Sequence, residues 1–124
     1  MPKQTNILTK SKVVGTTIAA YGIGAPATGQ TRYITFVCCH NLHRQHNTVY
    51  LASAANSANT STNTLASIAT KLRIDLEAAW EGKNVQVPQK PDVDTPLFSI
   101  AAGKCLNVKT SDGKASVFVQ YYDQ

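Results

Sequence analysis

The sequence predicts an all-β protein, an antiparallel β-sandwich of the jelly-roll or immunoglobulin type with an extended N-terminal arm. Three observations support this fold class. About seven or eight short runs of β-branched and aromatic residues recur with turn residues between them. Charged residues make up only 15% of the chain, and the abundant Thr, Ser, Asn and Val suit strands better than long surface helices. The length of 124 residues fits one domain with an apolar core.

The first 14 residues, MPKQTNILTKSKVV, are basic and contain few apolar positions. We expect them to form an arm outside the sandwich, which would occupy residues 15–124. An extended arm can add a strand to the edge of a neighbouring sheet through main-chain hydrogen bonds. Deletion of residues 1–12 should then leave the fold intact and weaken partner binding. The candidate partner-binding residues in this arm are Ile7, Leu8, Lys10 and Lys12.

A short strand is expected at 16–21, followed by the Gly- and Pro-containing loop GIGAPATGQ at 22–30. The run TRYITFVCCHN at 31–41 predicts a central strand, because simple alternation makes both of its faces apolar. These faces would carry Ile34, Phe36 and Cys38 on one side and Tyr33, Val37 and Cys39 on the other. The run 48–54 is expected to pair with it as a hairpin, and NSANTSTN at 56–63 to form a polar loop.

Residues 65–81 fit two patterns. Leu65, Ile68, Leu72, Leu76 and Trp80 are spaced as on a helix that Gly82 would cap. However, apolar and polar residues also alternate without a break over about ten residues here. A helix would leave an isoleucine on its polar face and acidic residues toward its negative end. We therefore favour a strand over about 69–77.

The C-terminal third predicts four further strands. KNVQVP at 83–88 reads as a short strand that its proline ends, and QKPDVDTP at 89–96 as an extended linker. LFSIAAGKCLNVKT reads as a strand, a small-residue corner and a second strand. SDGK at 111–114 predicts a hairpin turn, because Asp-Gly accepts positive φ. The chain closes with the strand 115–123.

The stretch FVCCHNLHRQH places Cys38, Cys39, His40, His43 and His46 close together in the sequence. Zinc sites need three or four ligands that converge, whereas adjacent cysteines in a strand point to opposite faces. We interpret the cysteines as small apolar residues and the histidines as a polar loop, with no metal or cofactor expected. One alternative is an ion held by His40 or His43 of several chains at an oligomer axis.

No catalytic pattern stands out elsewhere, so we do not expect an enzyme. A mid-strand cysteine lacks the positive, exposed setting that activates a thiol, and GIGAPATG lacks the frame of a phosphate-binding loop. The N-terminus has no apolar signal-peptide core, and no run approaches the ~20 apolar residues of a membrane span. The odd number of cysteines, three, argues against a disulfide framework. We expect synthesis in a reducing cytoplasm and no membrane contact.

Charge is unevenly distributed. Residues 1–74 carry seven Lys and Arg and no acid, hence +7, whereas residues 75–124 carry five lysines and seven acids, hence −2. A positive surface that meets a negative partner is one interpretation, and chance in a small soluble protein is the other. We do not expect direct nucleic-acid contact, because the basic residues are scattered and not grouped with Tyr33, Phe36 and Tyr50 on one face. A glycan-binding module with Trp80, Tyr121 and Tyr122 as platforms is the remaining alternative.

The order of segments from RYITFVCCHN through NTVYLASAA to PLFSIAAGKCLNVKTSDGKASVFVQYYD resembles the small β-sandwich virion proteins of tailed bacteriophages. The resemblance covers about residues 32–122, and this chain is longer at 55–68 and 78–95. It implies a capsid decoration or cement protein, with a neck or tail component as the alternative. It also implies a homotrimer or other small oligomer that contacts the major capsid protein or other virion proteins, and a location in the virion.

Overall fold

The computed structural model describes residues 6–17, 19–54, 69–78, 84–88 and 94–124. This part of the chain contains nine strands and no helix. The expected loop at 56–63, the cap at Gly82 and most of the linker at 89–96 lie outside it. The strands are β1 (Leu8–Val14), β2 (Ala19–Ala20), β3 (Arg32–Asn41), β4 (Asn47–Ala54), β5 (Ala69–Leu76), β6 (Asn84–Val87), β7 (Phe98–Ile100), β8 (Cys105–Thr110) and β9 (Ala115–Asp123).

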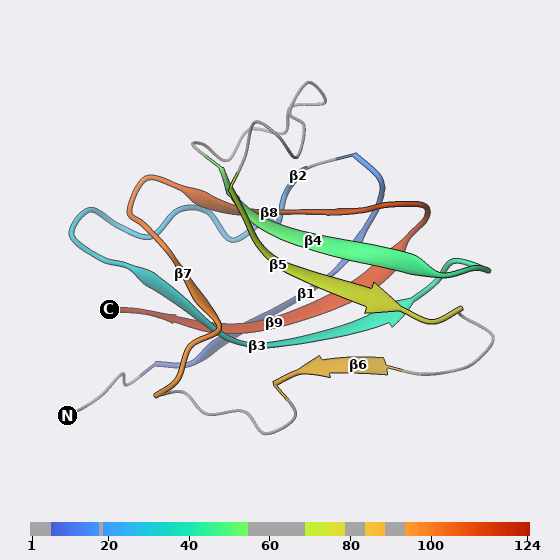
Figure 1. Ribbon diagram of the computed structural model, residues 1–124. Helices are drawn as coiled ribbons and strands as arrows, with labels where there is room; N and C mark the ends of the chain where they lie inside the picture. The colour runs from blue at the N-terminus through green and yellow to red at the C-terminus, as the bar shows by residue number, and fades with distance from the viewer. Residues whose placement is uncertain (1–5, 18, 55–68, 79–83, 89–93) are drawn as a thin grey trace.

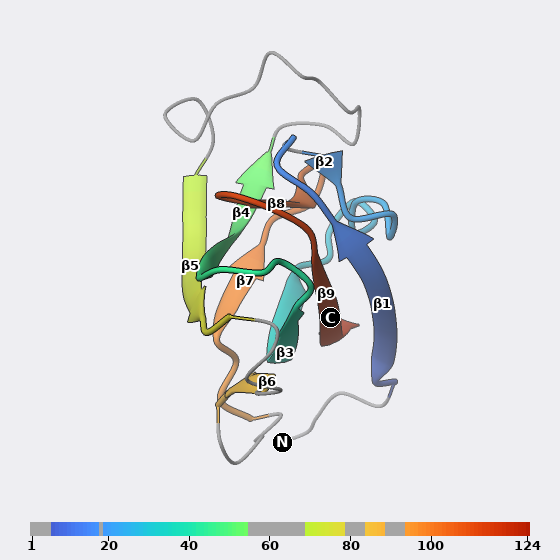
Figure 2. The same cartoon turned by 90° about the vertical axis from the view of Figure 1, so that its right-hand side faces the viewer.

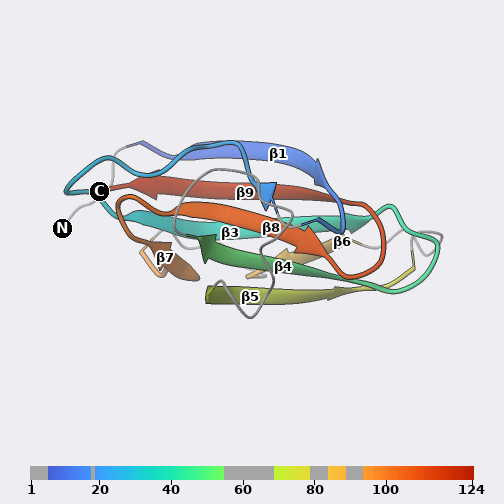
Figure 3. The same ribbon diagram turned by 90° about the horizontal axis from the view of Figure 1, so that it is seen from above.

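The strands form two antiparallel sheets that pack face to face, so the predicted sandwich is confirmed. One sheet has the order β1-β9-β3-β6, with β7 also paired to β3, and the other has the order β2-β8-β4-β5. Figure 1 shows them as a lower and an upper layer, and Figure 2 shows the same layers after a quarter turn. Seen from above, the strands of both layers run along one long axis (Figure 3), as in an aligned sandwich.

The connections identify the sandwich as a jelly roll. The chain changes sheet at every step between consecutive strands except from β4 to β5 and from β6 to β7. An immunoglobulin domain instead keeps its first two strands in one sheet. The eight-stranded jelly roll folds two Greek keys over each other in this way, with β6 and β7 here sharing the position of one edge strand beside β3.

Two expected hairpins are wrong for the same reason. Strands β3 and β4 lie in different sheets, so the connection at 42–46 crosses the sandwich and does not close a ladder. The turn at 111–114 likewise leads from β8 in one sheet to β9 in the other. Strand β3 has β9 on one edge and β6 with β7 on the other, which leaves no edge for β4.

The core lies between the inner faces of the two sheets. Aliphatic side chains of both sheets meet there, and burial of such apolar surface is the main force that stabilises the layers against each other. The largest fully buried hydrophobic side chains are Tyr21, Ile34, Val37, Val49, Leu51, Ile100, Leu106, Val108, Val117 and Val119.

A β-bulge in β3 corrects the predicted faces of this strand. The pairing with β9 shifts between Ile34 and Phe36, so that Thr35 stands opposite no partner residue. Thr35 donates its hydroxyl to the carbonyl of Gln120 at 3.2 Å. Because one extra residue reverses the alternation, Ile34 lies on the same face as Val37 and Cys39, which are fully buried. Phe36 and Cys38 share the outer face with Tyr33.

The expected division into an arm at 1–14 and a sandwich at 15–124 also changes. Residues 8–14 are the strand β1, which pairs with β9 over its whole length. Only Val14 of this strand is buried. A polar sequence can still hold such a place, because an edge strand gains main-chain hydrogen bonds whatever its side chains, and lysines are common there. Removal of residues 1–12 would delete most of β1 and uncover the edge of β9, so a harmless truncation is no longer expected.

The strand predicted at 69–77 is confirmed as β5. Ile74 and Leu76 face the core, whereas Lys71, Arg73 and Asp75 are exposed. The strand pairs with β4 on one edge. The alternation therefore outweighs the helical spacing in this segment.

Candidate interaction surfaces

The outer face of the β1-β9-β3-β6 sheet is the most distinctive surface of the described residues. Its positions follow from the pairing register, because residues directly opposite each other in neighbouring strands share a face. We call it the aromatic face. It consists of Thr9, Ser11 and Val13 of β1, Ser116, Phe118, Gln120 and Tyr122 of β9, Tyr33, Phe36, Cys38 and His40 of β3, Asn84 and Gln86 of β6, and Ser99 of β7.

Four aromatic rings run along the two central strands of this face. Tyr33 and Tyr122 are stacked, with ring centroids 5.2 Å apart and planes inclined by 28°. Phe36 and Phe118 meet edge to face at 6.1 Å. None of the four belongs to the core cluster, and Tyr33, Phe36 and Phe118 are half-buried. Burial raises the pKa of the Tyr122 phenol, and the nearby Tyr33 and Asp94 raise it further.

The aromatic face carries no Lys, Arg, Asp or Glu at any of its positions. The whole chain has 12 basic and seven acidic residues, so their absence here is a property of this face. Val13, which lies on this face opposite Ser116, is 52% exposed. Aromatic enrichment with few charges is the composition of the centre of a protein–protein interface.

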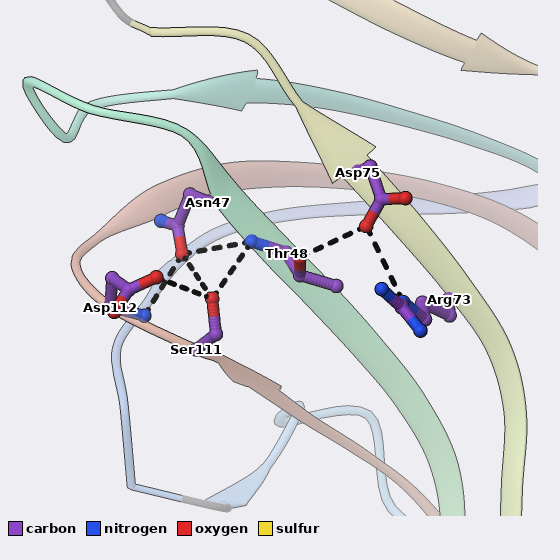
Figure 4. A network of polar contacts seen from close by, with 6 residues as sticks. All are labelled: Asn47, Thr48, Arg73, Asp75, Ser111 and Asp112. Carbon is purple, nitrogen blue, oxygen red and sulfur yellow. Dashed lines mark hydrogen bonds and ion pairs between the residues drawn. The ribbon is translucent and has the colours of Figure 1, made fainter.

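The outer face of the other sheet has different chemistry. Tyr50 on β4 stands directly between Lys109 on β8 and Arg73 on β5. Arg73 also pairs with Asp75 at 3.4 Å, and Asp75 accepts a hydrogen bond from Thr48 at 3.0 Å (Figure 4). Tyr50 therefore lies on the opposite side of the sandwich from Tyr33 and Phe36.

Asn47 organises one end of the sandwich, where two sheet-crossing connections meet. Its side-chain oxygen accepts hydrogen bonds from the N–H groups of Thr48 and Asp112, both at 3.0 Å, and from the Ser111 hydroxyl at 3.2 Å (Figure 4). Its amide nitrogen donates to the Gly113 carbonyl at 2.9 Å. This residue was not among the sequence candidates. An Asn at the start of a strand was its only signal.

Asn41, at the other end of the connection 42–46, also holds this end of the sandwich. Its amide donates to the carbonyls of Gln45 and Glu77 at 2.8 and 2.7 Å. Its oxygen accepts the N–H of His43 at 2.9 Å. Asn41 and Asn47 are almost completely buried, so these bonds satisfy amide groups that would otherwise be costly inside the protein. The network is structural: it fixes the two loops to each other.

The cysteines of the Cys38–His46 stretch lie on opposite faces of β3. Cys38 is half-buried on the aromatic face, whereas Cys39 is fully buried in the core. Burial, followed by the neighbouring Cys38, raises the pKa of Cys39 to about 12. Burial also raises the pKa of Cys38. Neither thiol has the lowered pKa of a catalytic cysteine.

The histidines of this stretch each have a different neighbour. The His40 ring is 2.6 Å from the side-chain oxygen of Asn84. His43 packs against Gly113, and His46 is 3.3 Å from Glu77. Within the described ranges, no group of three His, Cys, Asp or Glu side chains is arranged to hold a metal ion.

The four candidate partner-binding residues lie on or beside the edge strand β1. Ile7 precedes it and is half-buried, and Leu8 is 38% exposed. Lys10 and Lys12 share one face of the strand, and both side chains reach Gly22. The carbonyl of Lys10 accepts a hydrogen bond from the Tyr21 hydroxyl at 2.9 Å.

Two of the glycan-platform residues, Tyr121 and Tyr122, lie on opposite faces of β9. Trp80 lies outside the described residues. Tyr121 is buried on the inner face, where its ring supports the guanidinium of Arg32. Tyr122 is 8% exposed.

Comparison with models of known protein families finds no match, and a search of curated proteins finds none either. The described residues include no helix long and apolar enough to cross a membrane.

Proposed function

We propose that this protein is a structural component of a bacteriophage particle, a decoration or cement protein that stabilises the shell as a small oligomer. The observation that carries the proposal is the aromatic face, whose aromatic and uncharged strand positions match the composition of the centre of a protein–protein interface. The jelly-roll topology agrees with it, because this architecture recurs in viral capsid proteins. Lectins share this architecture too, so the topology alone does not distinguish a virion protein from a lectin.

The contact with the shell is assigned to the edge strand β1. Its polar, mostly exposed side chains include the basic pair Lys10 and Lys12. Its position at the end of the sheet order leaves one edge of β1 without a partner strand within the described part of the chain. Such an edge can accept a strand from a neighbouring protein. Each contact is modest, and repetition over the particle increases the total binding by avidity.

The test is whether the protein is found on the particle. Mass spectrometry of gradient-purified virions should detect it in many copies, as expected for a protein repeated over the shell. A few copies per particle would instead indicate a neck or tail component. Absence from purified virions would contradict the proposal, and binding to a glycan array would support the lectin alternative.

The role of β1 has its own test. Particles that lack the native copy should bind less of the Lys10→Gln and Lys12→Gln variants than of the wild-type protein. Binding of the wild-type protein should weaken as the salt concentration rises. Lys114→Gln is the matched control, because Lys114 is an exposed lysine outside β1. Equal binding by all three variants would remove the assigned role of the β1 lysines.

A further inference from the structure

We propose that the aromatic face is the site where a second copy of this chain binds. The aromatic faces of the two copies would pack against each other about a two-fold axis that runs between them. The inference rests on the proposed structural role and deepens it, because it names the partner and the surface. The edge of β1 stays open in this arrangement and remains available for the shell.

Charge selects the second copy over other partners. A nucleic acid needs Lys or Arg at its phosphates, and a strongly acidic or basic protein needs the opposite charge. None of the strand positions of the aromatic face carries either kind of side chain. The carboxyl of Asp94 lies near Tyr122, at one end of the face. A two-fold contact brings each surface patch against itself, so charged side chains near the axis would meet their own kind. An uncharged face avoids this repulsion in a chain with a net charge of +5.

The pattern of large and small side chains on the aromatic face also allows two copies of the face to interlock. The rings of Phe36 and Phe118 lie beside the small side chains of Cys38, Ser116 and Ser11 on neighbouring positions. Packed sheets approach to about 10 Å, which requires large side chains of one face to enter gaps between those of the other. Alternating large and small residues permit such interlocking when the same face is turned over onto itself.

The area is sufficient for a weak, specific dimer. Same-face residues are about 6.7 Å apart along a strand and strands are about 4.8 Å apart, so each position covers roughly 32 Å². Tyr122 is only 8% exposed, so the other positions of the face offer roughly 420 Å² of flat sheet per copy, and the side-chain relief adds accessible area. Two faces together approach the ~1,000 Å² of a specific interface. We therefore expect a dimer that dissociates in the micromolar range, about −8 kcal/mol.

Charge reversal at Gln120 tests this arrangement. Gln120 is half-buried on β9, between Phe118 and Tyr122 on the central strand of the face. Sedimentation equilibrium should show a dimer for the wild-type protein at about 100 µM. Gln120→Glu and Gln120→Lys should each dimerise about a hundredfold more weakly, because like charges then face each other. A 1:1 mixture of the two variants should regain the dimer. Arg73→Gln, on the opposite side of the sandwich, is the control and should leave dimerisation unchanged.

Wild-type protein that stays monomeric, variants that dimerise like wild type, or a mixture that fails to recover would each overturn the proposal. Cys38 gives a second readout without any mutation. Its thiol lies on this face, so its rate of alkylation should fall several-fold as the concentration rises through the dimer dissociation constant, and an unchanged rate would contradict the inference.

The two proposals fail in different ways. A dimer that is absent from particles contradicts the proposed function and leaves this surface standing. A particle-bound monomer overturns the dimer and the oligomeric part of the proposed function, and leaves the location in the particle standing.

Discussion

Arg32 and Asp123 form a two-bonded ion pair that joins the start of β3 to the end of β9. Nε of Arg32 is 2.7 Å from Oδ1 of Asp123, and Nη2 is 2.8 Å from Oδ2. The third nitrogen donates to the carbonyl of Gly24 at 2.6 Å, and the guanidinium lies 4.7 Å from the centre of the Tyr121 ring. One side chain thus ties two strands and the 22–30 loop together, and its side chain is only 5% exposed.

We expect Asp123→Asn to destabilise the protein by about 2–4 kcal/mol, because it leaves a buried guanidinium without its counter-charge. Urea denaturation at pH 7 measures the change. The double variant Arg32→Met with Asp123→Leu should recover part of the loss, since well-packed apolar residues can replace a buried ion pair. An Asp123→Asn variant within about 0.5 kcal/mol of wild type would show that this pair contributes little to stability.

Asn47 should be more sensitive to substitution than its polar character suggests. Asn47→Ala leaves the N–H of Asp112 without its side-chain acceptor. It also removes one of the two side-chain donors to the carbonyl of Gly113, the other being the Thr110 hydroxyl. We expect a loss of about 2–3 kcal/mol in the free energy of unfolding. Thr48→Val is the control, because it removes only the exposed bond to Asp75 and should cost about 0.5 kcal/mol or less. Equal effects of the two changes would contradict the central role of Asn47.

Gly113 is needed for space and not for its backbone angle. The sequence suggested positive φ at Asp-Gly, but the positive-φ glycines of the described residues are Gly22, Gly24, Gly29 and Gly103. A Cβ on Gly113 would clash with Nδ1 of His43 and lie 2.6 Å from Cγ and 2.8 Å from Cβ of the same side chain. Gly113 therefore lies directly under the His43 ring, where the two sheet-crossing connections touch.

Gly113→Ala should accordingly destabilise the protein by about 1–3 kcal/mol, the usual cost of overpacking. Combination with His43→Ala should restore most of this loss, because the clashing ring is then absent. Thermal unfolding of the two single variants and the double variant forms a double-mutant cycle. Additive losses would show that the contact with His43 is not the cause.

Local sequence patterns located most of the strands but not the strands with which they pair. Alternation identified β5 correctly, because Ile74 and Leu76 enter the core while Arg73 and Asp75 stay exposed. The same kind of pattern cannot reveal which sheet a strand joins. The short connection at 42–46 fits a hairpin and a sheet crossing equally well, and the choice depends on which edges of β3 are already occupied.

Two further features were hidden for physical reasons. The bulge at Thr35 reverses the faces of half of β3, and nothing in the composition of RYITFVCC marks one threonine as the extra residue. Consequently the cluster of Phe36 with Phe118 and of Tyr33 with Tyr122 emerged only from the register. Strand β1 was missed because its side chains are mostly exposed, so its stability comes from main-chain bonds that leave no hydrophobic pattern.

The three cysteines should differ in reactivity. Cys39 and Cys105 are 0% and 3% exposed, so they should react only when the protein unfolds. Cys38 is half-buried with a raised pKa, and only its small thiolate fraction reacts. We expect iodoacetamide at pH 8 to modify Cys38 first, more slowly than a free peptide thiol. Peptide mapping by mass spectrometry measures the order. Simultaneous modification of all three thiols in native buffer would contradict these positions.

Alkaline pH should destabilise the fold through Cys39. Its pKa rises from an ordinary 9.0 to about 12 because it is buried. Above pH 9 the unfolded chain therefore loses the thiol proton while the folded chain keeps it. The contribution is complete below pH 9 and is lost as pH rises from 9 toward 12, at up to about 1.4 kcal/mol per pH unit.

The Tyr21 hydroxyl, which donates to the carbonyls of Lys10 and Val117, acts in the same direction above pH 10, because burial raises its pKa as well. Urea denaturation of wild type and Cys39→Ala between pH 8 and 10.5 separates the two groups. The Ala variant should be less stable at pH 8, because it leaves a small cavity, but its stability should fall less steeply between pH 9 and 10. Parallel pH profiles for the two proteins would show that the Cys39 thiol has the same pKa in the folded and unfolded states. That result would contradict the complete burial of Cys39 in the core between the two sheets.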